Sequence, residues 1–104
     1  MNRGFQSVLN LTSDVTAIVK TLIEEDDQLR DVRVQGEISN LARPASGHLY
    51  FTLKDARSQI KCAMWKSQAI RLRAVPRDGE AVVVRGRVGV YESSGAYQLY
   101  VESL

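Results

Sequence analysis

The chain has 104 residues and a mass of 11.6 kDa, which is enough for one compact domain with a modest core but too little for two. Its 44% hydrophobic residues, 25% charged residues and net charge of +2 are ordinary for a folded protein and argue against a disordered chain. No apolar run approaches the roughly 20 residues of a spanning helix, and the N-terminus lacks the apolar core of a signal peptide, so we expect no membrane association and a cytoplasmic location.

The first predicted element is a helix between Thr12 and Leu29. Thr12 or Ser13 is expected to cap its start, and Asp14 lies in the first turn. The acidic run Glu24–Asp27 lies near the far end, where the helix dipole disfavours negative charge, so we interpret it as a solvated helix end. The apolar positions that give the helical spacing are Val15, Ile18, Val19, Leu22 and Ile23.

Beyond Asp31 the apolar residues recur at a period of about 2 instead of about 3.6, which is typical of half-buried strands. This alternation predicts three successive strands. Their apolar positions are Val32, Val34 and Ile38 in the first, Leu49, Phe51 and Leu53 in the second, and Ile60, Cys62 and Met64 in the third.

The segment Lys66–Arg73 is predicted to form one or two helical turns that stop before Pro76. A fourth strand follows over Glu80–Tyr91, and Gly86 and Gly89 are expected where it bends to close a barrel. A fifth strand begins after the turn "ESSG", with Tyr97, Leu99 and Val101 alternating with Gln98, Tyr100 and Glu102.

The order of these elements is a helix, three strands, a short helix and two strands. Five short strands with a helix between the third and fourth are typical of the OB-fold, a partly open Greek-key barrel. We therefore predict an all-β core, α+β overall, with residues 1–31 forming an N-terminal extension and helix packed on the barrel and residues 32–104 forming the barrel itself.

Such barrels bind oligonucleotides across their second and third strands and the adjoining loops. If Phe51 and its apolar partners face inward, alternation turns the intervening side chains outward, where rings can stack on bases and cations can neutralise phosphates. Positive charge also gathers here, because residues 32–104 carry eleven basic and six acidic side chains, against three and six in residues 1–31. The candidate nucleic-acid-binding residues are Tyr50, Lys61, Trp65, Arg43, His48, Lys54, Ser46, Gly47 and Arg33.

Several of these residues also have a purely structural interpretation. Trp65 ends a strand and could simply cover the mouth of the barrel. His48 is expected to order the glycine-containing loop by hydrogen bonds, since no nucleophile or carboxylate pair stands near it in the sequence. Arg85 and Arg87, on the fourth strand, either form only a solvated strand face or take part in binding, and Cys62 is expected in the core. One Cys and one His cannot supply the ligands of a zinc site, so we expect no metal, no cofactor and no catalytic residue.

Two stretches, "VRVQGEISNLARPASGHLYFTLKD" and "IKCAMW", closely resemble the N-terminal domain of the large subunit of exonuclease VII, a bacterial nuclease that degrades single-stranded DNA. The resemblance extends from about Thr12 to the end of the chain. It implies an OB-fold that binds single-stranded DNA and presents it to a nuclease domain further along the polypeptide. It also implies a small-subunit partner that binds a later helical region, so this fragment is expected to bind DNA without cutting it.

A more distant resemblance, to the anticodon-binding OB-folds of class II tRNA synthetases, implies the same orientation of the second strand. In those proteins an exposed aromatic residue of this strand stacks on an anticodon base. Tyr50 occupies that place here, and Lys61 occupies the neighbouring place on the third strand.

Three other functions are alternatives to DNA binding. RNA binding stays open, because stacking and phosphate contacts neither require nor forbid a 2′-hydroxyl. A protein-interaction module is disfavoured by the Lys and Arg side chains among the outward rings, since interface cores are depleted of Lys. An enzyme acting alone is disfavoured because the sequence shows no partnered nucleophile and no carboxylate cluster.

Overall fold

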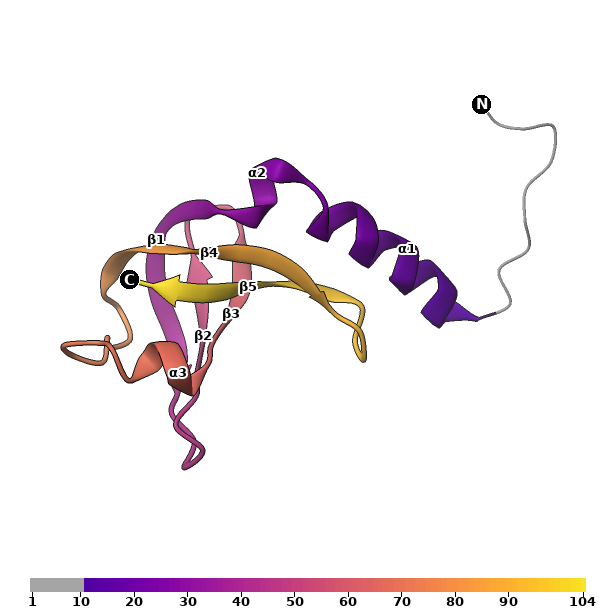
Figure 1. Ribbon diagram of the computed structural model, residues 1–104. Helices are drawn as coiled ribbons and strands as arrows, with labels where there is room; N and C mark the ends of the chain where they lie inside the picture. The colour runs from indigo at the N-terminus through magenta and orange to yellow at the C-terminus, as the bar shows by residue number, and fades with distance from the viewer. Residues whose placement is uncertain (1–10) are drawn as a thin grey trace, which may run out of the picture.

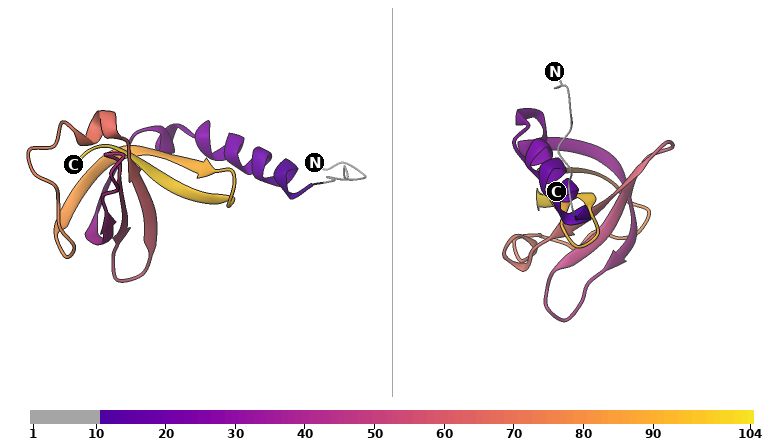
Figure 2. Two further views of the ribbon diagram at one scale, coloured as in Figure 1. Left: turned by 90° about the horizontal axis from the view of Figure 1, so that it is seen from below. Right: turned by 90° about the vertical axis from the view of Figure 1, so that its right-hand side faces the viewer.

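The computed structural model describes residues 11–104, which form a small barrel with a helix extending from one side (Figures 1 and 2). The barrel strands and the helices follow one another in an order that agrees with the predicted one, apart from a break in the first helix. The elements are α1 (Thr12–Glu24), α2 (Asp27–Arg30), β1 (Val32–Ala42), β2 (Leu49–Lys54), β3 (Gln59–Met64), α3 (Lys66–Ala69), β4 (Ala81–Tyr91) and β5 (Ala96–Ser103).

The five strands close into a barrel in the order β1-β2-β3-β5-β4, with β4 pairing back onto β1. The long strand β1 makes this closure possible, because residues 32–37 pair with β4 while residues from Glu37 to Ala42 pair with β2. All pairings are antiparallel except β3 with β5, which is parallel. This topology, with α3 between β3 and β4, confirms the predicted OB-fold.

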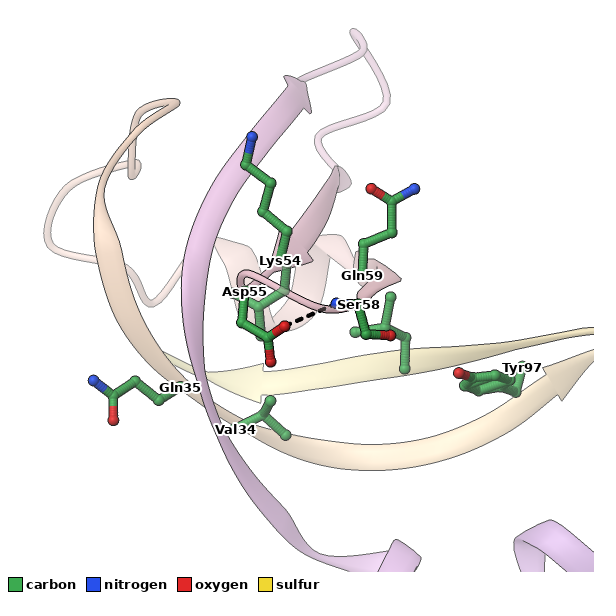
Figure 3. Close-up of a pocket in the computed structure, with 9 residues that line it drawn as sticks. Val34, Gln35, Lys54, Asp55, Ser58, Gln59 and Tyr97 are labelled. Atoms are coloured by element: carbon green, nitrogen blue, oxygen red, sulfur yellow. Dashed lines mark hydrogen bonds between the residues drawn. The ribbon is translucent and has the colours of Figure 1, made fainter.

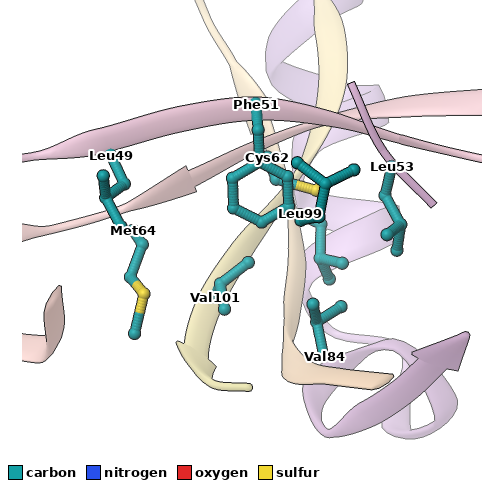
Figure 4. Close-up of a cluster of buried hydrophobic side chains, with 9 residues drawn as sticks. Leu49, Phe51, Leu53, Cys62, Met64, Val84, Leu99 and Val101 are labelled. Atoms are coloured by element: carbon teal, nitrogen blue, oxygen red, sulfur yellow. The ribbon is translucent and has the colours of Figure 1, made fainter. Parts of the chain in front are cut away.

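Most of the apolar side chains that the alternation assigned to the interior are buried there (Figure 4), but Val32, Val34 and Ile60 are only partly buried and Tyr97 is 52% exposed. Phe51 is 3% exposed, and Leu49 and Leu53, two residues away on either side along β2, are buried beside it. Cys62 is also buried, as predicted, and burial raises the pKa of its thiol to about 12. The buried core consists of Ile38, Leu49, Phe51, Leu53, Cys62, Met64, Val84, Leu99 and Val101.

Gly86 lets β4 and β5 approach closely at the point where the barrel turns. A side-chain carbon at this position would overlap the backbone carbonyl of Tyr100, so only glycine fits. The register between β4 and β5 shifts between Arg85 and Gly86. The prediction that a glycine marks a bend in this strand is therefore confirmed at Gly86.

The N-terminal helix differs from its prediction in two ways. It ends at Glu24, and a separate turn of helix, α2, begins after Asp26, whose side chain accepts a hydrogen bond from the backbone N–H of Gln28 at 2.8 Å. An Asp side chain that bonds the backbone in this manner favours a new helix start over continuation. The predicted caps were wrong as well, because Leu11 is the N-cap residue and its own side chain makes no cap, while the carboxylate of Asp14 accepts a hydrogen bond from the backbone N–H of Leu11 at 3.4 Å.

The helix α1 lies against β4 and the β4–β5 turn through a polar face. Glu24 Oε2 accepts a hydrogen bond from the backbone N–H of Val90 at 3.1 Å and lies 2.7 Å from Lys20 Nζ. Thr16 faces the turn near Gly95. The interpretation of the acidic run as a solvated end is therefore wrong for Glu24, which connects the helix to the barrel. Of the apolar residues that made the helix recognisable, Val15, Ile18, Val19 and Leu22 are exposed, whereas Ile23 is half-buried.

Replacing Glu24 with alanine is expected to lower the free energy of unfolding by about 1 kcal/mol at neutral pH, because the partly exposed carboxylate loses both partners. The hydrogen bond from Lys20, together with that from Val90, holds the pKa of Glu24 below its ordinary value of 4.5. This contribution is therefore fully present above pH 4.5 and is lost as the pH falls through the lower pKa of the folded protein.

Urea unfolding of this variant and of Glu25→Ala, at neutral and at acidic pH, checks the expectation. Glu25 is exposed and adjacent, so its replacement should change stability by no more than about 0.5 kcal/mol. Equal stabilities of the two variants at neutral pH would contradict the role given to Glu24.

Candidate nucleic-acid interface

Aromatic rings gather on the outer face of the barrel where β2, β3 and β5 lie side by side. The rings of His48 and Trp65 are 5.2 Å apart between centroids, and those of Tyr50 and Trp65 are 6.3 Å apart, both edge to face. Tyr100 joins them from β5, with its ring centroid 5.8 Å from that of Trp65. We call His48, Tyr50, Trp65 and Tyr100 the aromatic cluster. Tyr50 and Trp65 remain 39% and 41% exposed, so each presents ring surface to solvent.

The strand register explains why residues so far apart in sequence meet here. Tyr50 of β2 lies opposite Ala63 of β3, Ala63 lies opposite Tyr100 of β5, and Tyr100 lies opposite Arg87 of β4. Ala63 is only 2% exposed although it points outward, because the larger side chains on either side cover it. The Arg87 guanidinium carbon is 4.6 Å from the centroid of the Tyr100 ring, a cation–π contact at the end of this row.

The loop between β1 and β2 is fixed next to the aromatic cluster by His48. The Nδ1 atom of His48 accepts a hydrogen bond from the backbone N–H of Lys66 at 2.8 Å, which joins the loop to the start of α3. Gly47 has a φ of 92° and packs against the alkyl chain of Lys66. Arg43 and Ser46 are exposed on the same loop. The structure therefore gives His48 the loop-ordering contact expected of it.

A groove of about 690 Å³ runs along this face beside the aromatic cluster. Lys61 lines it from β3, and Thr52, which points outward but is only 8% exposed, contributes to its floor. Asn40, with a φ of 53°, borders the groove from β1. The lining residues are Asn40, Tyr50, Phe51, Thr52, Lys61, Cys62, Trp65, Tyr91 and Gln98.

The structure does not bring Lys54 and Arg33 to the aromatic cluster. Lys54 is at the far end of β2, beside a smaller pocket of about 170 Å³ at the β2–β3 turn (Figure 3). In that turn, Asp55 accepts hydrogen bonds from the backbone N–H groups of Arg57 and Ser58, and these bonds hold the pKa of Asp55 below its usual range. Arg33 is on the half of β1 that pairs with β4, opposite Arg85.

Arg85 and Arg87 are both exposed on β4, and each also makes a specific contact. Arg85 donates two hydrogen bonds to the carboxylate of Asp31, at 2.8 and 2.9 Å, and these hold the pKa of Asp31 below its usual range. This contact ties the segment after α2 to β4. Arg87 instead lies over Tyr100 at the edge of the aromatic cluster.

Sequence reasoning missed the contributions of β4 and β5 to this face. Alternation with Leu99 and Val101 already implied that Gln98 and Tyr100 point outward. It could not show that β5 lies beside β3, which places Tyr100 next to Trp65. Tyr91 was missed for the same reason, because it lines this face from β4 only through the pairing of β4 with β5. Binding by Arg87 was left open by the sequence, but its contact with Tyr100 depends on the same pairing.

The assembled face has the groups needed to hold a single-stranded polyanion: exposed rings for stacking, and Lys and Arg side chains for phosphates. Within residues 11–104, the structure contains no group of three His, Cys, Asp or Glu side chains placed to hold a metal ion. Over the same residues, none of the helices is both long and apolar enough to cross a membrane.

Comparison with curated proteins finds close relatives of this chain. It is 52% identical to the exodeoxyribonuclease 7 large subunit of Geobacter metallireducens over 92 residues, which covers 88% of this chain and 20% of the relative. The corresponding subunit of Ruminiclostridium cellulolyticum is 46% identical over 104 residues, covering 100% of this chain and 24% of the relative. The chain thus spans between a fifth and a quarter of the length of these relatives.

Solved structures share the barrel at much lower sequence identity. A replication protein A heterotrimer bound to single-stranded DNA matches with a TM-score of 0.56 at 19% identity, covering 71% of this chain and 54% of the other. The single-stranded-DNA-binding (SSB) domain of a Synechococcus protein matches with a TM-score of 0.55 at 16% identity, covering 74% of this chain and 94% of the other. These matches establish the fold.

The sequence profile of a family described as "OB-fold nucleic acid binding domain" matches residues 8–104, which is nearly the whole chain. The match includes every strand of the barrel and every residue of the aromatic cluster. The chain therefore belongs to the OB-fold nucleic acid binding domain family.

Proposed function

We propose that this chain binds single-stranded DNA across the aromatic cluster and serves as the DNA-binding module of an exodeoxyribonuclease large subunit. The observation that carries the proposal is the row Tyr50, Ala63, Tyr100 and Arg87, with Trp65 in contact with both tyrosines. Unpaired bases stack on exposed rings, each stack contributing about 1 to 3 kcal/mol, whereas bases within a duplex are already stacked on each other.

Each candidate residue has a distinct role in this proposal. Tyr50 and Trp65 stack on bases, and Lys61 and Arg43 neutralise phosphates on either side of them. Ser46 and Gly47 offer loop contacts to the backbone of the strand, while His48 holds the loop in place. Lys54 and Arg33, which lie away from the aromatic cluster, add long-range attraction of the polyanion.

We also propose a wider setting, which the length of the relatives supports because this chain covers only 20% and 24% of them. In a protein of that length, residues 32–104 would serve as the binding barrel, and the bound strand would pass to a nuclease domain elsewhere in the polypeptide. We further propose that the whole protein acts in the cytoplasm together with a small subunit that binds outside this barrel.

Titration with an oligothymidylate and with a duplex carrying the same number of phosphates, each at 50 and 200 mM salt, tests the proposal. The single strand is expected to bind more tightly at both salt concentrations, and its affinity should fall as salt rises because phosphate contacts release counterions. Equal affinities for the single strand and the duplex would show plain charge attraction and would overturn the stacking proposal.

A further inference from the structure

The segment that follows Trp65 carries positive charge only. Residues 66–77 contain Lys66, Arg71, Arg73 and Arg77 and no acidic side chain, and all four are exposed. Arg77 has a neighbouring carboxylate, because its Nε lies 3.9 Å from Glu80 Oε1. The other three form no salt bridge with any residue between 11 and 104. Three cations at one end of the barrel are therefore available to a ligand.

Two of these cations line a groove of about 400 Å³ between this segment and the end of β5. Its polar lining comes from Arg71 and Arg73, from Ser103 at the end of β5 and from the amide of Gln68 in α3. Met64 and Leu72 add apolar surface, while Glu102 contributes a single carboxylate. A concave site with apolar surface and converging polar groups has the general character of a ligand-binding site.

The groove begins where the aromatic cluster ends. Trp65 is the N-cap residue of α3, and its ring packs on Tyr100, two residues before Glu102 on β5. On the other side of α3, Lys66 and Arg43 line a second hollow of about 200 Å³ together with Gly47. The hydrogen bond from Lys66 N–H to His48 holds the start of α3 against the loop. Cations thus continue the binding face beyond β2 and β3.

We propose that a single strand stacked on the aromatic cluster continues over α3, with its phosphates on Lys66, Arg71 and Arg73. This inference rests on the proposed function and adds to it a path for the strand past the end of the sheet. The ligand class is the sugar-phosphate backbone, because guanidinium groups bind phosphate oxygens in bidentate geometry and carry no base preference when they do so. A strand long enough to reach α3 gains these contacts, and a shorter one does not.

Binding of oligothymidylates of 4 and 12 nucleotides to Arg71→Gln and Arg73→Gln, at 50 and 200 mM salt, tests this path. The matched control is Arg57→Gln, which removes the same charge from the exposed β2–β3 turn at the other end of β2. For single strands the logarithm of affinity falls with that of salt by about 0.7 per phosphate contact. Raising the salt from 50 to 200 mM should therefore weaken binding of the 12-mer to the wild type about 2.5-fold more than it weakens binding of the 12-mer to either variant.

The same variants should bind the 4-mer as the wild type does, and Arg57→Gln should leave the salt dependence of both oligomers unchanged. If Arg71→Gln and Arg73→Gln behave like Arg57→Gln on the 12-mer, the path over α3 is overturned, as expected if this groove instead binds an acidic protein segment. If Arg71→Gln and Arg73→Gln weaken binding of the 4-mer as much as binding of the 12-mer, the path over α3 is also overturned. Failure of the wild type to bind either oligomer would reject the proposed function itself, which is a different result.

Discussion

Phe51→Ala is expected to lower the free energy of unfolding by about 3 to 5 kcal/mol. The ring is 3% exposed and lies in the centre of the buried core, where its removal leaves a cavity that neighbouring side chains cannot fill (Figure 4). A domain of this size has a total stability of roughly 5 to 15 kcal/mol, so the variant loses a large share of it. Chemical unfolding monitored by circular dichroism measures the difference.

The matched control is the residue immediately before it. Tyr50→Ala removes a side chain of similar size from the outer face, where edge contacts with His48 and Trp65 and part of the cover over Ala63 are lost, and it should cost about 1 kcal/mol. The two variants therefore separate the two faces of β2. If Tyr50→Ala unfolds the domain while Phe51→Ala does not, the strand faces are reversed and the aromatic cluster belongs to the core.

The second large effect is on binding. Tyr50→Ala is expected to weaken the complex with a single-stranded oligonucleotide by about 1 to 3 kcal/mol, which is roughly 5- to 150-fold in the dissociation constant. The slope of affinity against salt should stay the same, because the lost contact is with a base. Lys61→Ala should instead reduce the slope of the logarithm of affinity against the logarithm of salt concentration by about 0.7, which is the contribution of one phosphate contact on a single strand. Fluorescence anisotropy of a labelled oligothymidylate at several salt concentrations measures both quantities.

Tyr97→Ala provides the control for the stacking contact. Tyr97 is an exposed tyrosine on β5, 52% accessible, but it lines the pocket beside Lys54 and not the aromatic cluster (Figure 3). Its removal should leave affinity unchanged. A loss of affinity as large as that of Tyr50→Ala would mean that the strand does not follow the aromatic cluster.

The interior of the barrel could be predicted because each strand has one face that must be buried. The period of 2 in Leu49, Phe51 and Leu53 assigns the core face of β2, and it assigns Tyr50 to the opposite face without any knowledge of the topology. The bounds predicted for the fourth strand, Glu80–Tyr91, lie within one residue of β4, and β5 begins directly after the predicted turn. These are local properties of the chain, and the structure confirms them.

Contacts between distant segments could not be predicted in the same way. Tyr100 meets Trp65 only because β5 pairs in parallel with β3 across the closed barrel, and alternation carries no information about that neighbour. For the same reason, alternation indicated that Lys54 and Arg33 point outward from the barrel, but it could not indicate how far they lie from the aromatic cluster. Likewise, the spacing of apolar residues identified the helix α1. It did not identify the polar face that contains Glu24 and contacts β4.

The most direct test of the account is the intrinsic fluorescence of Trp65 during titration with an oligothymidylate. Trp65 is the single tryptophan of the chain, so its signal reports on the aromatic cluster alone. We expect a saturable change in emission with the single strand, and a much smaller change with a duplex of equal phosphate number, because only unpaired bases stack beside the indole. Saturable binding that leaves Trp65 emission unchanged, or the same change with the duplex, would contradict it.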